Sequence, residues 1–286
     1  MKAMKGPKYD GKYLRALLQG YLGEIKLNQT LTPVIIPTFD IKHLQPIIFS
    51  TFEAKRDELK NPLLSDVCIS TSAAPIFLPA YHFKTSNSQK EERSFNLIDG
   101  GVAANNPTLI AMSMITRELL MLKEKFFTTN PLNYGRFLVI SLGTGSAKEE
   151  SKFDASEASK WGMFGWLYNG DSMPLLDAFS QASADMVDIH AYILFQALLS
   201  EKYYLRIELG NLSGTASSVD VSTETNMRNL IQIGNDHLKK PMSRVNLETG
   251  VYEEAKGEGS NADALARFAK ILSEERRARQ ALFFDL

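Results

Sequence analysis

The residues best suited to chemistry lie in the segment from Phe95 to Pro107. Its first residues, Phe95–Ile98, predict a buried strand, which ends in the carboxylate of Asp99. In open α/β sheets functional groups gather at the carboxyl ends of strands, so we expect Asp99 at the rim of a cleft. A partly apolar setting there would raise the pKa of Asp99 unless hydrogen bonds stabilise its anion.

Two glycines follow Asp99 before the next helix begins. Gly100 and Gly101 can adopt backbone angles that a side chain forbids, and they leave room for a ligand or another backbone segment. The same residues have a simpler interpretation, because Asp-Gly is a common turn signal and Asp99 would then only cap a turn. From the residues alone the turn is favoured, and the catalytic hypothesis stays open.

Two further segments contain groups that could act as a nucleophile or hold a phosphate. Ser70, Thr71 and Ser72 carry hydroxyls, but none lies in the G-x-S-x-G turn that exposes a nucleophilic serine. We favour a tightly packed helix end, stopped by Pro75. Gly143–Ser146 follows a strand, but it lacks the third glycine of G-x-G-x-x-G and the lysine of a P-loop. We interpret it as a strand-to-loop turn.

Large apolar side chains also gather between residues 161 and 168. Trp161, Met163, Phe164, Trp166 and Tyr168 could belong to a core or face a lipid surface. Of these two interpretations we favour the core.

The composition excludes several classes of protein. The 286 residues include 32 basic and 33 acidic side chains, a net charge of −1 that argues against a nucleic-acid partner. A single cysteine, Cys68, excludes an intramolecular disulfide and a thiolate zinc cluster. The four histidines are far apart in the sequence, with no pair at metal-ligand spacing, so we expect no histidine metal site. No apolar run reaches the roughly 18 residues of a membrane span, and the first residues show no signal peptide.

Short apolar runs alternate with helical patterns along the chain. Strands are predicted at 32–37, 45–51, 95–98, 136–142 and 203–209, helices at 106–123, 172–200, 223–238 and 261–282, and loops at 84–93, 146–154 and 249–259. The run at 136–142 is continuously apolar, as expected of a strand covered on both faces of a parallel sheet. The alternation predicts an α/β fold, a layered α/β/α sandwich with a mostly parallel central sheet. No segment resembles a linker, so we expect one domain spanning residues 1–286.

Several segments together resemble the patatin family of plant lipid acyl hydrolases, and most closely the patatin-like proteins. They are residues 39–55, 61–83, 95–109, 138–146, 179–190, 204–220 and 239–250. The resemblance implies that residues 1–113 form the end of the phospholipase core, 114–250 its remaining strands and helices, and 251–286 a variable tail helix. In such proteins a D-G-G/A motif supplies the aspartate of a Ser-Asp catalytic dyad. Asp99 is therefore implied to be the general base, with Gly100 and Gly101 completing the motif.

Two motifs of the family do not occur in these 286 residues. One is the glycine-rich D-G-G-G-x-R-G loop, whose amides form the oxyanion hole, and the other is the G-x-S-x-G turn with the nucleophilic serine. We expect both to precede residue 1, so that the chain is roughly the C-terminal two thirds to three quarters of a patatin domain. Loss of one oxyanion donor commonly costs about 3–4 kcal/mol, and loss of the nucleophile lowers kcat on the order of a millionfold. The chain alone is therefore expected to be close to inactive.

The resemblance also implies what the complete protein does. It would hydrolyse fatty-acyl esters of phospholipids and galactolipids through an acyl-enzyme, with a membrane or lipid micelle as partner, no cofactor and no transmembrane segment. Roles in plant defence or storage follow from the same resemblance, as does a cytoplasmic location, or a vacuolar one if a signal peptide lies upstream of Met1. The absent serine suggests the alternative, a non-catalytic storage or binding protein of patatin descent.

Overall fold

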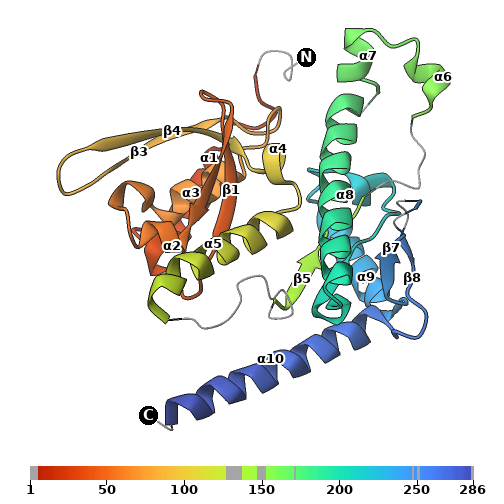
Figure 1. Cartoon of the computed structure of the whole chain (residues 1–286). Coiled ribbons are helices and arrows are strands. Elements are labelled where there is room, and N and C mark those ends of the chain that lie inside the picture. The colour runs from red at the N-terminus through yellow and green to blue at the C-terminus, as the bar shows by residue number, and fades with distance from the viewer. Residues whose placement is uncertain are drawn as a thin grey trace. The chain divides into compact units, whose positions relative to one another are not determined.

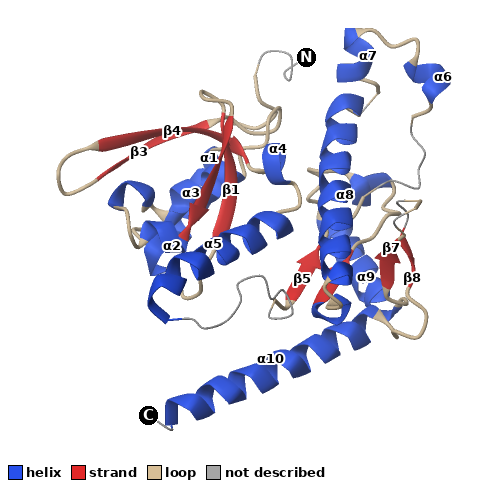
Figure 2. Cartoon of the chain, in the orientation of Figure 1, coloured by secondary structure: helices blue, strands red, loops and turns tan. Residues whose placement is uncertain are grey.

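The computed structural model describes residues 6–126, 137–146, 153–170, 172–246, 248–249 and 252–284 (Figure 1). Helices and strands are both present, which confirms the α/β class (Figure 2). The chain divides into two compact units, the first comprising Met1–Pro131 with Phe179–Ala184 and the second Leu132–Ala178 with Asp185–Leu286. None of the helices among the described residues is long and apolar enough to cross a membrane.

A four-stranded sheet organises the first unit. Its elements are α1 (Lys12–Leu22), β1 (Ile35–Asp40), β2 (Gln45–Ser50), α2 (Thr51–Ala54), α3 (Leu64–Thr71), β3 (Tyr81–Ser86), β4 (Glu92–Asp99), α4 (Gly101–Ala104) and α5 (Thr108–Phe126), with short 3₁₀ helices at Leu27–Gln29 and Glu58–Lys60. The strand order is β2-β1-β4-β3, and every neighbouring pair is antiparallel.

The sheet is antiparallel, whereas the sequence predicted mostly parallel pairing, and short connections explain two of its three strand pairs, β1–β2 and β3–β4. Only four residues join β1 to β2, and Asp40 Oδ1 accepts hydrogen bonds from the backbone N–H groups of Lys42 and His43 in that turn. A second hairpin, closed by a hydrogen bond from Asn87 N–H to the carbonyl of Glu91, joins β3 to β4. A parallel crossover needs a dozen residues or more, so these connections permit antiparallel pairing alone.

The core of the first unit fixes the orientation of β4. Phe95 and Leu97 are buried, and the ring of Phe95 lies 4.8 Å from that of Phe83 and 5.4 Å from that of Phe49, centroid to centroid. Side chains two residues apart lie on the same face of a strand. The side chain of Asp99 therefore follows Phe95 and Leu97 on the buried face of β4.

The second unit contains the remaining elements. They are β5 (Val139–Leu142), α6 (Ala155–Ala158), α7 (Met163–Leu167), α8 (Pro174–Ala197), β6 (Tyr204–Ile207), α9 (Glu224–Lys239), β7 (Ser243–Val245), β8 (Tyr252–Glu254) and α10 (Asn261–Phe284), with 3₁₀ helices at Glu201–Tyr203 and Gly214–Ser217. Residues 179–184 of α8 count with the first unit. β5 pairs with β6 in parallel, as predicted, and β7 pairs with β8 antiparallel.

The long helices lie where their periodicity and caps predicted them. The segments predicted at 106–123, 172–200, 223–238 and 261–282 form α5, α8, α9 and α10. Asn106 Oδ1 accepts a hydrogen bond from Thr108 N–H at the start of α5, and Thr223 Oγ1 accepts one from Asn226 N–H at the start of α9. The expected cover on both faces of 136–142 is not observed, because Leu142 of β5 is 67% exposed.

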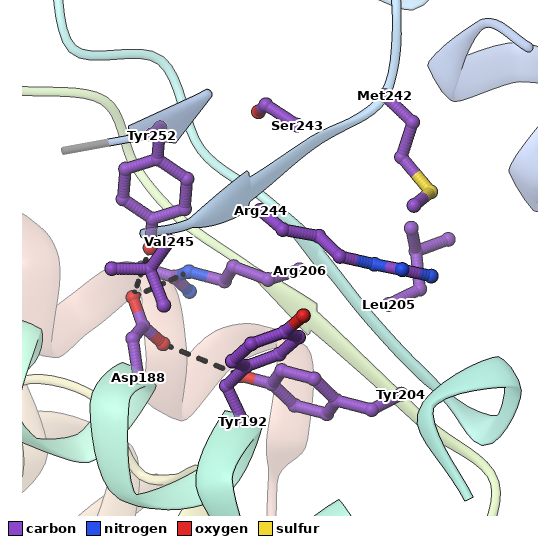
Figure 3. A pocket seen from close by; sticks show the side chains of 10 residues that line it. All are labelled: Asp188, Tyr192, Tyr204, Leu205, Arg206, Met242, Ser243, Arg244, Val245 and Tyr252. Atoms are coloured by element: carbon purple, nitrogen blue, oxygen red, sulfur yellow. Dashed lines mark hydrogen bonds and ion pairs between the residues drawn. The ribbon is translucent and has the colours of Figure 1, made fainter. Parts of the chain in front are cut away.

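A buried cluster of charges ties β6 to α8 and β8 in the second unit (Figure 3). The guanidinium of Arg206 forms ion pairs with Asp188, at 2.9 Å, and with Glu208, at 2.6 Å. Tyr252 donates a hydrogen bond of 2.6 Å from its hydroxyl to Asp188 Oδ2. Burial raises the pKa of Glu208, and the nearby charge of Arg206 opposes that rise. One cation thus holds two buried carboxylates in place.

Replacement of Arg206 by Met should therefore destabilise the protein by about 3–5 kcal/mol, because two buried carboxylates would lose their shared cation. The measurement is urea denaturation at neutral pH. The matched control is Arg228→Met, whose ion pair with Glu224 is exposed and should contribute no more than about 0.5 kcal/mol. Equal effects of the two substitutions would contradict the structural role of Arg206.

Candidate active site

Asp99 lies at the end of β4, where three elements of the first unit meet. It stands opposite Thr38 of β1 in the sheet register, and its N–H donates a 3.0 Å hydrogen bond to the carbonyl of Ala73, just beyond the end of α3. The helix α4 begins two residues later, at Gly101. The backbone of Asp99 is therefore held by β1 on one side and by Ala73 on the other, which fixes the position of its Cα atom.

Gly100 is required by a close approach of two backbone segments. A Cβ atom at this position would lie 2.0 Å from the carbonyl oxygen of Pro37 and 2.5 Å from its carbonyl carbon. No side chain can move aside there, because both atoms belong to the main chain of β1. The same Pro37 oxygen accepts a 2.8 Å hydrogen bond from the hydroxyl of Thr71 at the end of α3.

The carboxylate of Asp99 is half-buried and bound on one side only. Its Oδ1 accepts a 2.7 Å hydrogen bond from Gly101 N–H, so Asp99 caps this turn, and the bond leaves the catalytic hypothesis open. Burial raises the pKa of Asp99, and the hydrogen bond from Gly101 lowers it by less. Within the described part of the chain no cation pairs with Asp99 and no second hydrogen bond reaches its carboxylate. A buried carboxylate in this state is a better proton acceptor than an ordinary aspartate.

Asp40, on the same sheet, shows the opposite electrostatic setting. Burial alone would raise its pKa, but hydrogen bonds from His43 and Lys42 outweigh burial and hold the pKa below its ordinary value. The ring Nδ1 of His43 lies 2.9 Å from Asp40 Oδ2. Asp40 is therefore a structural carboxylate whose anion is stabilised by hydrogen bonds, whereas the surroundings of Asp99 disfavour its anion.

The hydroxyls near the end of α3 are engaged with the backbone. Ser70 is fully buried and donates to the carbonyl of Asp66, while Thr71 donates to Pro37. The helix ends at Thr71, and Ser72 follows as its C-cap. The packed helix end that the sequence predicted is confirmed, and neither Ser70 nor Thr71 is presented as a nucleophile.

The glycines of Gly143–Ser146 also have a structural cause. A Cβ at Gly143 would lie 1.7 Å from Glu208 Oε2, and Gly145 N–H donates a 3.0 Å hydrogen bond to Glu208 Oε1. The loop therefore closes over a carboxylate, which would repel a phosphate. The strand-to-loop turn is confirmed, and the phosphate-loop hypothesis has no support.

Neither a metal ligand set nor an activated thiol accompanies Asp99. Across the described residues no group of three or more His, Cys, Asp or Glu side chains could hold a metal ion. Burial raises the pKa of the Cys68 thiol, which keeps it protonated and unreactive. Asp99 with Gly100 and Gly101 remains the candidate site.

Comparison with known proteins gives the class to which this fold and site belong. A family model described as "Patatin-like phospholipase" matches residues 3–112, a range that includes Asp99, Gly100 and Gly101. The class is thus that of lipid acyl hydrolases, and it implies an α/β/α sandwich fold.

Named relatives cover almost the whole chain. Patatin-like protein 2 of rice (Oryza sativa subsp. indica) is 54% identical over 98% of this chain and 70% of its own length. Patatin-like protein 3 of Arabidopsis thaliana is 50% identical over 98% of this chain and 66% of its own length. Patatin-T5 of Solanum tuberosum is 41% identical over 96% and 67%. The chain belongs to the patatin-like phospholipase family and spans about two thirds of the length of these relatives.

Replacing Gly100 by Ala should destabilise the first unit by several kcal/mol, because the new methyl group would overlap a main-chain carbonyl. Thermal and urea denaturation measure the loss. The control is Gly20→Ala within α1, where the added Cβ has nothing within 4 Å and should stabilise the helix by about 0.5–1 kcal/mol. Destabilisation of similar size at both positions would contradict the close approach at Pro37.

Asp99→Asn should stabilise the protein at neutral pH, because Asn keeps an acceptor for Gly101 N–H and removes a poorly solvated charge. The native state disfavours the Asp99 anion, so the advantage of the variant should grow as pH rises above the ordinary aspartate value of 3.8 and through the raised pKa. Asp40→Asn should do the reverse and destabilise at neutral pH, with the difference shrinking as pH falls. Urea denaturation across this pH range measures the free energy of unfolding of both variants. If both substitutions changed the stability at neutral pH in the same direction, the contrast drawn here between Asp99 and Asp40 would be wrong.

Proposed function

We propose that Asp99 is the base of a Ser-Asp dyad in a hydrolase that releases fatty acids from phospholipids and galactolipids at the surface of a membrane or micelle. The single observation that carries the proposal is the setting of Asp99. It is a half-buried carboxylate with a raised pKa and no cation paired with it among the described residues, and it opens a D-G-G motif inside the segment matched by the family model.

In the proposed reaction Asp99 accepts the proton of a serine hydroxyl directly. The serine oxygen attacks the ester carbonyl, the bond to the alcohol breaks, and the leaving alcohol takes the proton that Asp99 received from the serine. Water attacks the acyl-enzyme that remains and passes its proton to Asp99, the bond between the acyl group and the serine oxygen breaks, and Asp99 returns the proton to the serine as the fatty acid is released. The serine lies outside the 286 residues in this proposal, because they contain no G-x-S-x-G turn.

Three features of the chain support this role for Asp99. Burial raises its affinity for a proton. The hydrogen bond from Gly101 fixes Oδ1, which leaves Oδ2 as the atom that receives the proton. The contact of Gly100 with Pro37 sets the start of the side chain and so limits its positions. Positioning of this kind is a large part of what a general base contributes.

A non-catalytic storage or binding protein is the second candidate. The observation in its favour is the lack of a G-x-S-x-G serine in these 286 residues. It predicts that supplying such a serine does not produce turnover, whereas the hydrolase proposal predicts that it does.

The test joins the chain to an N-terminal segment of a patatin-like relative that bears the serine turn and the glycine loop. We expect this fusion to release fatty acid from phosphatidylcholine and galactolipid micelles, and the 286-residue chain alone to be close to inactive. Asp99→Asn in the fusion should lower kcat by roughly 10²–10⁴-fold. Titration of released fatty acid measures each rate.

Asp66→Asn is the matched control, because Asp66 is another half-buried carboxylate of the first unit whose pKa burial raises. It accepts a hydrogen bond from Tyr81 and should leave kcat within a few-fold. Full activity of the Asp99→Asn fusion would remove Asp99 from the mechanism. A folded fusion without turnover would favour the non-catalytic candidate.

A further inference from the structure

The residues of α7 and Tyr168 after it form an exposed apolar segment in the second unit. Five of its side chains are largely accessible, namely Met163 at 68%, Phe164 at 73%, Trp166 at 40%, Leu167 at 40% and Tyr168 at 55%. The sequence favoured a core position for this cluster, and the structure corrects that prediction. Figure 1 shows α7 beyond the N-terminal end of α8, away from β7 and β8.

The segment packs around Trp161. The ring of Trp161 lies 5.5 Å from that of Phe153 and 5.3 Å from that of Trp166, edge to face in both cases. A Cβ at Gly165 would come within 2.8 Å of Trp161 Cβ, so the glycine allows this packing. Trp161 itself is half-buried, whereas Met163 and Phe164 are largely exposed.

Residues 161–170 carry no charged side chain. The segment therefore has no electrostatic preference for an acidic or a basic partner. It combines large apolar side chains with the polar ends of Trp and Tyr, the combination found where proteins meet the interface between lipid and water. An uncharged apolar surface of this kind matches lipids whose head groups have no net charge.

The size of the segment argues against a second copy of the chain as its partner. Five side chains of this size and exposure offer roughly 500 Å². A stable protein interface needs about 800 Å² on each side, so this segment is too small to hold a dimer. A bilayer needs no such area, because each inserted side chain gains by itself from leaving water.

We infer that α7 and Tyr168 are a docking element that inserts into the surface of a bilayer or micelle of zwitterionic or uncharged lipids. The inference rests on the proposed function, which requires a lipid surface, and it names the part of the chain that holds the protein there. Met163 and Phe164 enter the acyl region, while Trp166 and Tyr168 lie at the head-group level. Electrostatic attraction has no part in this binding.

The chain has two tryptophans, Trp166 within this element and Trp161 two residues before it, so tryptophan fluorescence reports on this region. Phosphatidylcholine vesicles should shift the emission to shorter wavelength, and brominated lipid should quench it. Added salt or anionic phosphatidylglycerol should not change the affinity. Met163→Ser/Phe164→Ser should weaken binding by on the order of tenfold for each residue, measured by vesicle co-sedimentation.

The control is Leu31→Ser/Val219→Ser, which removes two exposed apolar side chains elsewhere and should leave vesicle binding unchanged. Phe164→Trp should retain it. The inference is overturned if the chain does not bind vesicles, if both double variants bind equally, or if the α7 variant alters self-association instead. Vesicle binding by the Asp99→Asn chain should equal that of the wild type, so a failure of the docking element and a failure of the catalytic proposal give different results.

Discussion

The carbonyl oxygen of Pro37 is the atom on which the candidate site depends. The hydroxyl of Thr71 binds it from the end of α3, and the missing side chain of Gly100 lets the turn after β4 pass directly over it. One strand, one helix and one turn are therefore fixed at a single point. Asp99 directly precedes Gly100, so the same contact at Pro37 fixes the backbone from which the Asp99 side chain extends. The described residues provide no ion pair that would hold the carboxylate instead.

The position of Asp99 at the end of a buried strand was predictable from the sequence, because an apolar run followed by Asp-Gly-Gly has few other interpretations. The antiparallel pairing of that strand with β3 was not, since it depends on the hairpin at residues 87–91. Residues 84–93 were predicted as a loop, but the structure places Tyr81–Ser86 in β3. The mixture of polar and apolar side chains in this segment resembles a turn region. What identifies it as a strand is the packing of Phe83 against Phe95, which the sequence does not show.

Composition was equally ambiguous for two other segments. The glycines of Gly143–Ser146 suggested a ligand, but the group they make room for is the side chain of Glu208, 63 residues away in the sequence from Gly145. The aromatic residues around α7 were assigned to a core because large apolar side chains usually lie there. Pattern alone could not separate Trp161, which is half-buried against Phe153 and Trp166, from the exposed apolar residues that follow it.

Gly143 and Gly100, two of the close-packed glycines, differ in whether a second mutation could make room for an added side chain. A methyl group at position 143 meets the end of a side chain, so a second mutation that shortens Glu208 would restore the fit. A methyl group at position 100 meets the main chain of β1, which every amino acid shares. No compensating substitution of a neighbour can remove that carbonyl, and loss of Gly100 is therefore open only to reversion. Position 143 can therefore change together with position 208, whereas a substitution at position 100 can be corrected only by restoring glycine.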